Sequence, residues 1–105
     1  MHNPKINQLL EFLKEDPNDP FTLYALALEY EKQDQEQTRK YYDLLLKEHP
    51  DYLATYYHAA KFYEKQDRTK AEEIYRAGMT LALSQRKTKP YQELQNALNL
   101  LLEDE

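Results

Sequence analysis

The sequence contains no cysteine and no tryptophan, and it has one glycine among its 105 residues. The lack of cysteine excludes disulfides, thiol catalysis and cysteine-bound metals, and a single glycine excludes a glycine-rich phosphate loop. No run alternates apolar and polar residues over the length of a strand. No apolar run approaches the roughly 18 residues that a membrane span requires, and the N-terminus lacks the pattern of a secretory signal. These absences predict an all-α chain with a cytoplasmic location.

Charged residues are abundant, at 31% of the chain, and the acidic ones prevail to give a net charge of −5. An acidic protein repels the phosphate backbone of nucleic acid. The one basic cluster consists of Arg86, Lys87 and Lys89, and three charges in a loop are typical of a solvated connection between helices. We therefore expect neither nucleic acid nor a membrane as a partner.

Residues that could carry chemistry are present but scattered along the chain. The three histidines are His2, His49 and His58, and no two of them have the spacing of a metal-ligand pair. Glu72 and Glu73 are adjacent, so they would point apart on a helix rather than act as an acid–base pair. Ser84 has no histidine and aspartate arranged to activate it. The sequence thus predicts a non-enzymatic protein with no catalytic residue, no metal and no cofactor.

An internal repeat organises the chain. The five residues Tyr30–Asp34 return unchanged as Tyr63–Asp67, an offset of 63 − 30 = 33 residues. A period of this length is characteristic of helical-repeat architectures. Each copy also carries two apolar stripes at helical spacing. The repeat therefore predicts two helix–turn–helix units of about 33 residues each.

Helix signals divide the chain into four segments within a single domain, residues 1–105. Asn3-Pro4 and Asp19-Pro20 each combine a capping side chain with a proline at the first helical position. We predict an N-terminal helix over residues 4–15, a first repeat over 19–50, a second repeat over 51–84 and a C-terminal helix over 88–102. The second repeat has Leu83 where the first has Pro50, so its last helix is expected to continue to about Ser84.

The spacing of large and small residues resembles the tetratricopeptide repeat, whose signature is W-x2-L-G-x2-Y, then A-x3-F, then P. The matching residues are Leu23, Leu26, Ala27, Tyr30, Thr38, Tyr42 and Pro50 in the first copy, then Tyr56, Ala59, Ala60, Tyr63, Ala71 and Tyr75 in the second. Tyr91, Leu94 and Leu98 resemble the capping helix of that family. The resemblance implies antiparallel helix pairs in a right-handed superhelical stack of five to six helices. The turn inside each copy is one residue shorter than in the family.

The resemblance also implies a function, that of a protein–protein interaction module or scaffold that binds a peptide or protein segment in a concave groove. Carried over position by position, the groove would be lined by Tyr24, Leu28, Glu31, Tyr57, Lys61, Glu64, Lys65, Gln92 and Asn96. Tyr24 and Tyr57 are repeat equivalents, and they suit partner binding and packing at the rim equally well. Only Lys89 matches the family's carboxylate-binding clamp, so such a clamp is not expected.

Two further expectations concern packing. The alternative function is a self-associating structural protein that forms a homodimer through exposed apolar faces, with Phe12, Leu100 and Leu102 as the candidate contacts. Gly78 occupies a position where the family prefers alanine. We therefore expect Gly78 to be a close-packing position at which alanine is tolerated and leucine is not.

Overall fold

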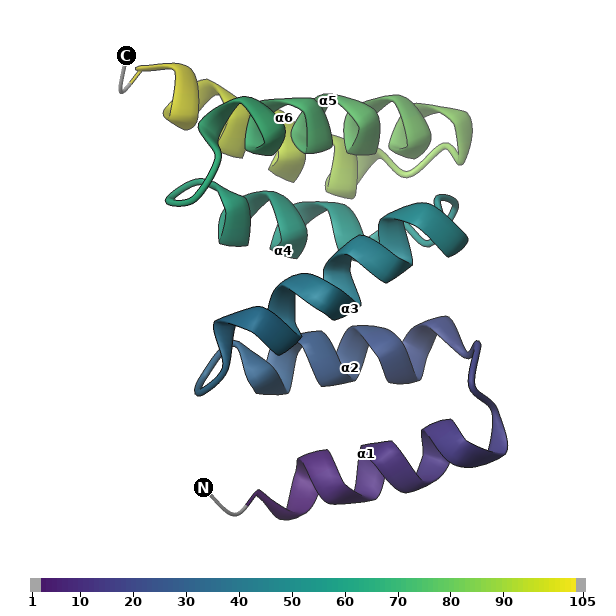
Figure 1. Ribbon diagram of the computed structural model, residues 1–105. Coiled ribbons are helices and arrows are strands. Elements are labelled where there is room, and N and C mark those ends of the chain that lie inside the picture. Colours follow the sequence, from purple (N-terminus) through teal and green to yellow (C-terminus); the bar gives the residue numbers. More distant parts are fainter. Residues whose placement is uncertain (1–2, 104–105) are drawn as a thin grey trace. The chain divides into compact units, whose positions relative to one another are not determined.

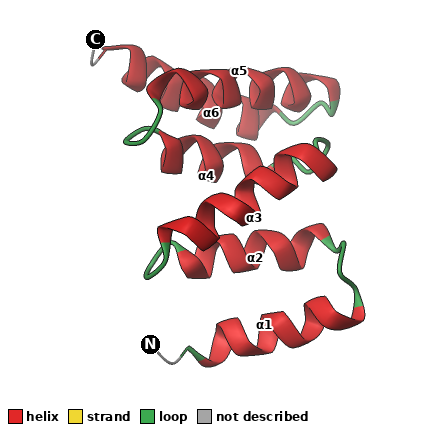
Figure 2. Cartoon of the chain, in the orientation of Figure 1, coloured by secondary structure: helices red, strands yellow, loops and turns green. Residues whose placement is uncertain are grey.

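The computed structural model describes residues 3–103, and the chain divides into two compact units, residues 1–52 and 53–105. Residues 3–103 form six helices and no strand (Figures 1 and 2). The predicted fold class, all-α with five to six helices, is confirmed at six.

The first unit contains α1 (Pro4–Glu15), α2 (Pro20–Tyr30) and α3 (Gln35–Glu48). α2 packs against both α1 and α3 (Figure 1). The two predicted helix starts are present: the Asn3 side chain accepts hydrogen bonds from the amides of Lys5 and Ile6, and Asp19 accepts one from the Thr22 amide. These caps satisfy amides that have no partner inside the helix.

The core of the first unit consists of apolar residues from the stripes that the sequence marks. Its buried apolar residues are Ile6, Leu23, Leu26, Ala27, Tyr41, Tyr42 and Leu45. Only Ile6 of the α1 stripe is buried, whereas Leu9, Leu10 and Leu13 are partly exposed. The apolar face of α1 is therefore only partly buried in this unit.

The second unit contains α4 (Ala54–Tyr63), α5 (Arg68–Ser84) and α6 (Thr88–Glu103), and α5 packs against both of the others (Figure 1). Its core includes Tyr56, Ala59, Ala60, Tyr63, Ala71, Ile74, Tyr75, Leu94, Leu98 and Leu101. The guanidinium of Arg68 donates a hydrogen bond to the carbonyl of Leu101, which joins the start of α5 to the last turns of α6.

The turn between the two helices is the same in both repeats. The amides of Asp34 and Asp67 each donate to a tyrosine carbonyl, that of Tyr30 or Tyr63, at 2.8 Å. The Asp34 side chain then accepts from the Gln37 amide at 3.2 Å. The Asp67 side chain accepts from the Lys70 amide at 3.1 Å. The short turn is therefore closed by an aspartate that caps the following helix, which is why it needs no glycine.

Gly78 is a close-packing position, but the expectation that it would tolerate alanine is wrong. A Cβ atom at Gly78 would lie 2.6 Å from the Cβ of Tyr56 and 3.1 Å from the Cδ1 of Leu94. The Tyr56 Cβ is fixed to its backbone, so α4 or α5 would have to shift. Sequence propensity alone favours alanine in a helix, and the contact with α4 reverses that preference.

Candidate functional site

The nine residues predicted to line a groove lie in both units. Tyr24, Leu28 and Glu31 belong to α2 and its C-terminal cap in the first unit. The other six, all in the second unit, are Tyr57, Lys61, Glu64, Lys65, Gln92 and Asn96. Leu28 and Tyr57 are partly exposed and Lys61 is exposed, so each unit presents side chains of this set to solvent.

In the first unit, Tyr24 packs on Tyr52. The two ring centroids are 5.8 Å apart and the planes meet at 62°, an edge-to-face arrangement that aromatic quadrupoles favour. Partial burial raises the pKa of Tyr24, and the neighbouring Tyr52 and Glu31 raise it further. Burial and the charge of Asp19 raise the pKa of Tyr52. The first unit therefore presents an aromatic pair in a negative environment.

Glu31 is the C-terminal cap of α2 and lies beside the core tyrosine Tyr42. Burial raises the pKa of Tyr42 well above its ordinary value, and the charge of the neighbouring Glu31 raises it further. Tyr42 is fully buried, so Glu31 lies next to the core of the first unit.

In the second unit, three predicted residues form a connected group: Tyr57, Lys61 and Glu64. The Lys61 ammonium lies 5.9 Å from the centroid of the Tyr57 ring and 3.9 Å from a carboxylate oxygen of Glu64. The imidazole of His58 contacts the Tyr57 ring edge-on, with 5.5 Å between ring centroids. The Lys61 ammonium thus makes a cation–π contact with Tyr57 and an ion pair with Glu64, and it links these two side chains.

Glu64 repeats the position of Glu31 beside a core tyrosine. The Tyr75 hydroxyl donates a hydrogen bond of 2.5 Å to the Glu64 carboxylate. Burial raises the pKa of Tyr75 well above its ordinary value, and the hydrogen bond to Glu64 and the charge of Glu64 raise it further. The offsets are the same for both partners (64 − 31 = 33 and 75 − 42 = 33), so a tyrosine–glutamate pair is part of each repeat.

The remaining predicted residues, Lys65, Gln92 and Asn96, are exposed. No side-chain hydrogen bond, ion pair or ring contact joins any of them to another residue between 3 and 103. They are available to solvent but are not organised with Tyr57, Lys61 and Glu64 by direct contacts.

Tyr52 and the positions of Tyr42 and Tyr75 beside glutamates were not predicted from the sequence. The tyrosine–glutamate pairs could have been found, because the two residues are 11 apart in both copies and the pair recurs at the repeat offset. Tyr52 gives no such signal, since it stands in a loop at the position that Asp19 holds in the first repeat (52 − 19 = 33).

The side chains considered above as candidates for catalysis or metal binding do not form a cluster among residues 3–103. Among residues 3–103, no three histidine or acidic side chains lie close enough together to hold a metal ion. His2 is outside the described residues. His49 lies 3.1 Å from the side-chain oxygen of Asn18, and His58 lies against Tyr57. None of the helices within 3–103 combines the length and the apolarity that crossing a membrane requires.

The fold and these surface residues define a helical-repeat protein. Two structures of a tetratricopeptide repeat domain protein from Salinibacter ruber are similar to it. The solution structure is 41% identical over 82% of this chain and 89% of that chain, with a TM-score of 0.76. The crystal structure is 39% identical over 84% of this chain and 100% of that chain, with a TM-score of 0.77.

These similarities show that the chain belongs to the tetratricopeptide repeat family. A solution structure of a protein from Bordetella parapertussis, 20% identical over 99% of this chain and 91% of that chain, shares the fold with a TM-score of 0.81. No family model and no curated protein matches the chain. Neighbours of this fold are in general non-enzymatic modules for protein–protein interaction.

Proposed function

We propose that this protein is a non-enzymatic interaction module that binds a peptide or protein segment in a concave groove. The observation that carries the proposal is membership of the tetratricopeptide repeat family. Tyr24 and Tyr57 support it, because they recur at the repeat offset and neither is fully buried. Partly exposed tyrosines are frequent anchors of protein interfaces, since a stiff ring offers a large area at little entropic cost.

The two units would contribute different contacts to such a partner. We propose that the first unit contributes the Tyr24–Tyr52 aromatic pair with Leu28 and Glu31. The second would contribute Tyr57 with the Lys61–Glu64 ion pair, and Lys65, Gln92 and Asn96 would add polar contacts. Binding would consist of burying the aromatic area and making polar contacts, with no covalent step.

The test is binding by the double variant Tyr24→Ala/Tyr57→Ala. Partners are first captured with the full-length protein, and their affinities are then measured individually by calorimetry. If either tyrosine is an anchor, we expect affinity to fall by about 2 kcal/mol, roughly 30-fold. Glu36→Ala, an exposed change in the first turn of α3, is the control and should bind as the wild type does. A folded double variant with unchanged affinity would exclude the tyrosines as the site.

The second candidate function is self-association, favoured by the exposure of Phe12 (49%) and Leu100 (62%). Large apolar side chains that are exposed to water favour association, because a second chain can bury them. Light scattering at several concentrations tests this: a monomeric mass at every concentration would eliminate the homodimer, and a dimer should dissociate in Phe12→Ser/Leu100→Ser. The cytoplasmic location stays a prediction.

A further inference from the structure

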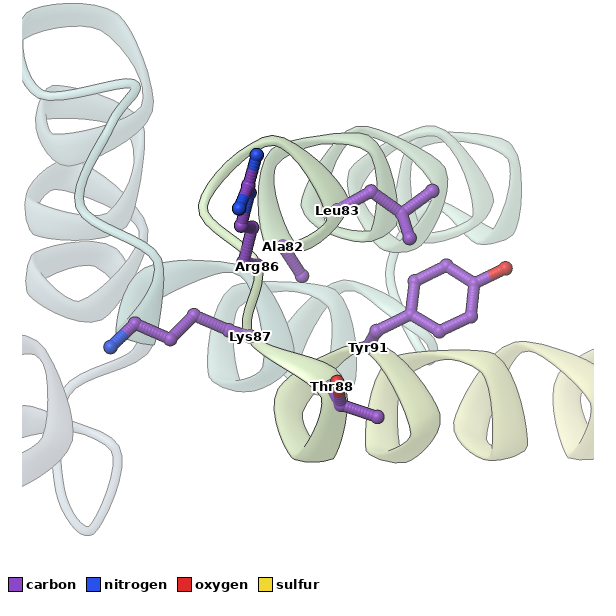
Figure 3. A pocket seen from close by; sticks show the side chains of 6 residues that line it. All are labelled: Ala82, Leu83, Arg86, Lys87, Thr88 and Tyr91. Atoms are coloured by element: carbon purple, nitrogen blue, oxygen red, sulfur yellow. The ribbon is translucent and has the colours of Figure 1, made fainter.

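A small pocket lies where α5 ends and α6 begins, and none of the nine residues discussed above lines it. It is lined by Ala82, Leu83, Arg86, Lys87, Thr88 and Tyr91, and Figure 3 shows these side chains around the turn between the two helices. Its volume of about 80 Å³ is several times the roughly 10–15 Å³ that one water molecule needs. The pocket therefore has room for an aliphatic side chain.

The wall of this pocket is apolar and open to solvent. Leu83 is 61% exposed although it is a large aliphatic residue, and Tyr91 is only partly buried. Figure 3 shows the two side chains extending to the same side of the turn. Ala82, which is fully buried, also lines the pocket. An apolar side chain placed here would cover surface that the protein itself leaves in water.

Uncompensated positive charges lie beside the apolar wall, where Figure 3 shows the Arg86 and Lys87 side chains leaving the turn in directions away from Leu83 and Tyr91. Arg86, Lys87 and the neighbouring Lys89 are exposed. Within residues 3–103 no carboxylate pairs with any of these three side chains. In the same unit, by contrast, Lys61 pairs with Glu64 and Arg76 with Glu72. The first turn of α6 also has no acidic residue, so the positive end of that helix adds to the same field.

Arg86 stands at a backbone position where glycine would be more stable. It has φ 58°, its amide donates to the Leu83 carbonyl at 3.1 Å, and the Lys87 amide donates to the Ala82 carbonyl at 2.8 Å. This is the Schellman arrangement, in which the left-handed residue is usually glycine. A cation beyond the end of α5 stabilises that end, but this benefit does not require arginine in a left-handed conformation.

We propose that this α5–α6 pocket is a second peptide-binding site, which takes an aliphatic side chain flanked by carboxylates from a partner protein. The aliphatic group lies between Leu83 and Tyr91, and the flanking carboxylates pair with Arg86 and Lys87. The charge complementarity is specific to this place, because the protein as a whole has a net charge of −5 and repels acidic segments elsewhere. The site shares no residue with the groove proposed above, so either can fail without the other.

The probe is the blocked peptide acetyl-Glu-Asp-Leu-Asp-Glu-amide, added to the ¹⁵N-labelled full-length protein and followed by NMR. We expect saturable shifts of backbone amides within residues 82–91. Affinity should fall about tenfold for the neutral analogue acetyl-Gln-Asn-Leu-Asn-Gln-amide, and again when serine replaces the leucine. Raising the salt concentration should weaken binding of the acidic peptide because it screens charge.

Variants of the protein separate this site from general charge attraction. Arg86→Gly/Lys87→Gln should weaken the acidic peptide about tenfold while keeping the turn, because glycine suits the left-handed position. The control Lys40→Gln/Lys47→Gln removes the same charge from exposed residues of α3 and should leave affinity unchanged. Tyr24→Ala/Tyr57→Ala should also leave it unchanged. Equal binding of the neutral peptide, shifts outside residues 82–91, or no loss in the Arg86/Lys87 variant would each overturn the proposal.

Discussion

The two repeats have the same turn and the same tyrosine–glutamate pair but differ in the residues around them. Both turns are closed by a capping aspartate, and in both the glutamate at the end of the preceding helix raises the pKa of a core tyrosine. The first repeat has Leu28 where the second has Lys61, and it has Leu45 where the second has Gly78. The backbone pattern is thus common to both repeats, whereas packing and surface charge are specific to each.

Differences in packing compensate each other inside each repeat. Two core positions that face each other in the second repeat differ between the repeats. In the first repeat they hold Leu23 and Leu45, and both are fully buried. The second has Tyr56 and Gly78 at these positions, with the Gly78 Cα facing the Tyr56 Cβ. A larger residue on one helix accompanies a smaller one on its partner, as close packing requires.

The largest effect is expected at Gly78. Gly78→Ala should lower the free energy of unfolding by about 1–3 kcal/mol, and Gly78→Leu by more, because the added atoms meet Tyr56 and Leu94. Chemical denaturation measures both changes. Ala77→Gly, at the exposed neighbouring position, is the matched control and should cost only the helix propensity, about 1 kcal/mol. A Gly78→Ala variant as stable as the wild type would show that α4 and α5 separate freely.

The tyrosine–glutamate pairs come next. We expect Tyr75→Phe to cost about 1–2 kcal/mol, since it removes the hydrogen bond from the Tyr75 hydroxyl to the Glu64 carboxylate. Tyr42→Phe should cost less, because the short hydrogen bond made by Tyr75 has no equivalent at the Tyr42 hydroxyl. Chemical denaturation measures both changes. Equal losses would argue that the hydrogen bond to Glu64 contributes little to stability.

The same pairs predict a loss of stability in alkali. Folding raises the pKa of Tyr42 and Tyr75 above the ordinary value of 10.0, so the unfolded chain ionises first. The stabilisation is complete below pH 10 and decreases as the pH rises above it, by about 1.4 kcal/mol per pH unit for each tyrosine. Denaturation between pH 8 and about 11 should show a shallower decrease in Tyr75→Phe than in the wild type. Identical slopes would contradict the raised pKa.

The ends of the repeats also differ: Pro50 follows the first, while α5 runs on to Ser84 and then Arg86. Arg86→Gly should raise the free energy of unfolding by about 0.5–1 kcal/mol, because glycine adopts a positive φ without steric conflict. Thermal denaturation at constant pH measures the gain. Lys87→Gly, next to it, serves as control and should give no gain. A destabilised Arg86→Gly would mean that its side chain contributes more than its backbone costs.

The smallest effect is expected where surface charge differs between the repeats. Lys61→Leu, which copies Leu28 of the first repeat, should change stability by less than about 0.5 kcal/mol, because the Lys61–Glu64 pair is partly exposed. Denaturation provides the measurement. A change above about 1 kcal/mol would show that the contact of Lys61 with Tyr57 or Glu64 is stronger than an exposed ion pair normally is.

Much of the fold followed from local signals, and much of the site did not. The caps Asn3, Asp19 and Asp67 bond to amides within three residues of themselves, so caps of this kind can be predicted from the sequence. The predicted site residues are exposed or half-buried, and their contacts depend on neighbouring helices. That these nine form one binding surface stays a prediction, and so does the single-domain division.

The sequence by itself determined the two repeats, the helical character of every segment and the capped starts of α1 and α2, because periodicity and capping act over three or four residues. The tertiary structure decided that Tyr52 meets Tyr24 and that Tyr75 bonds to Glu64. It also decided that Gly78 has no room for a methyl group. These contacts depend on how closely two helices approach. Differences of tenths of an ångström in that approach decide them, and residue spacing does not specify such differences.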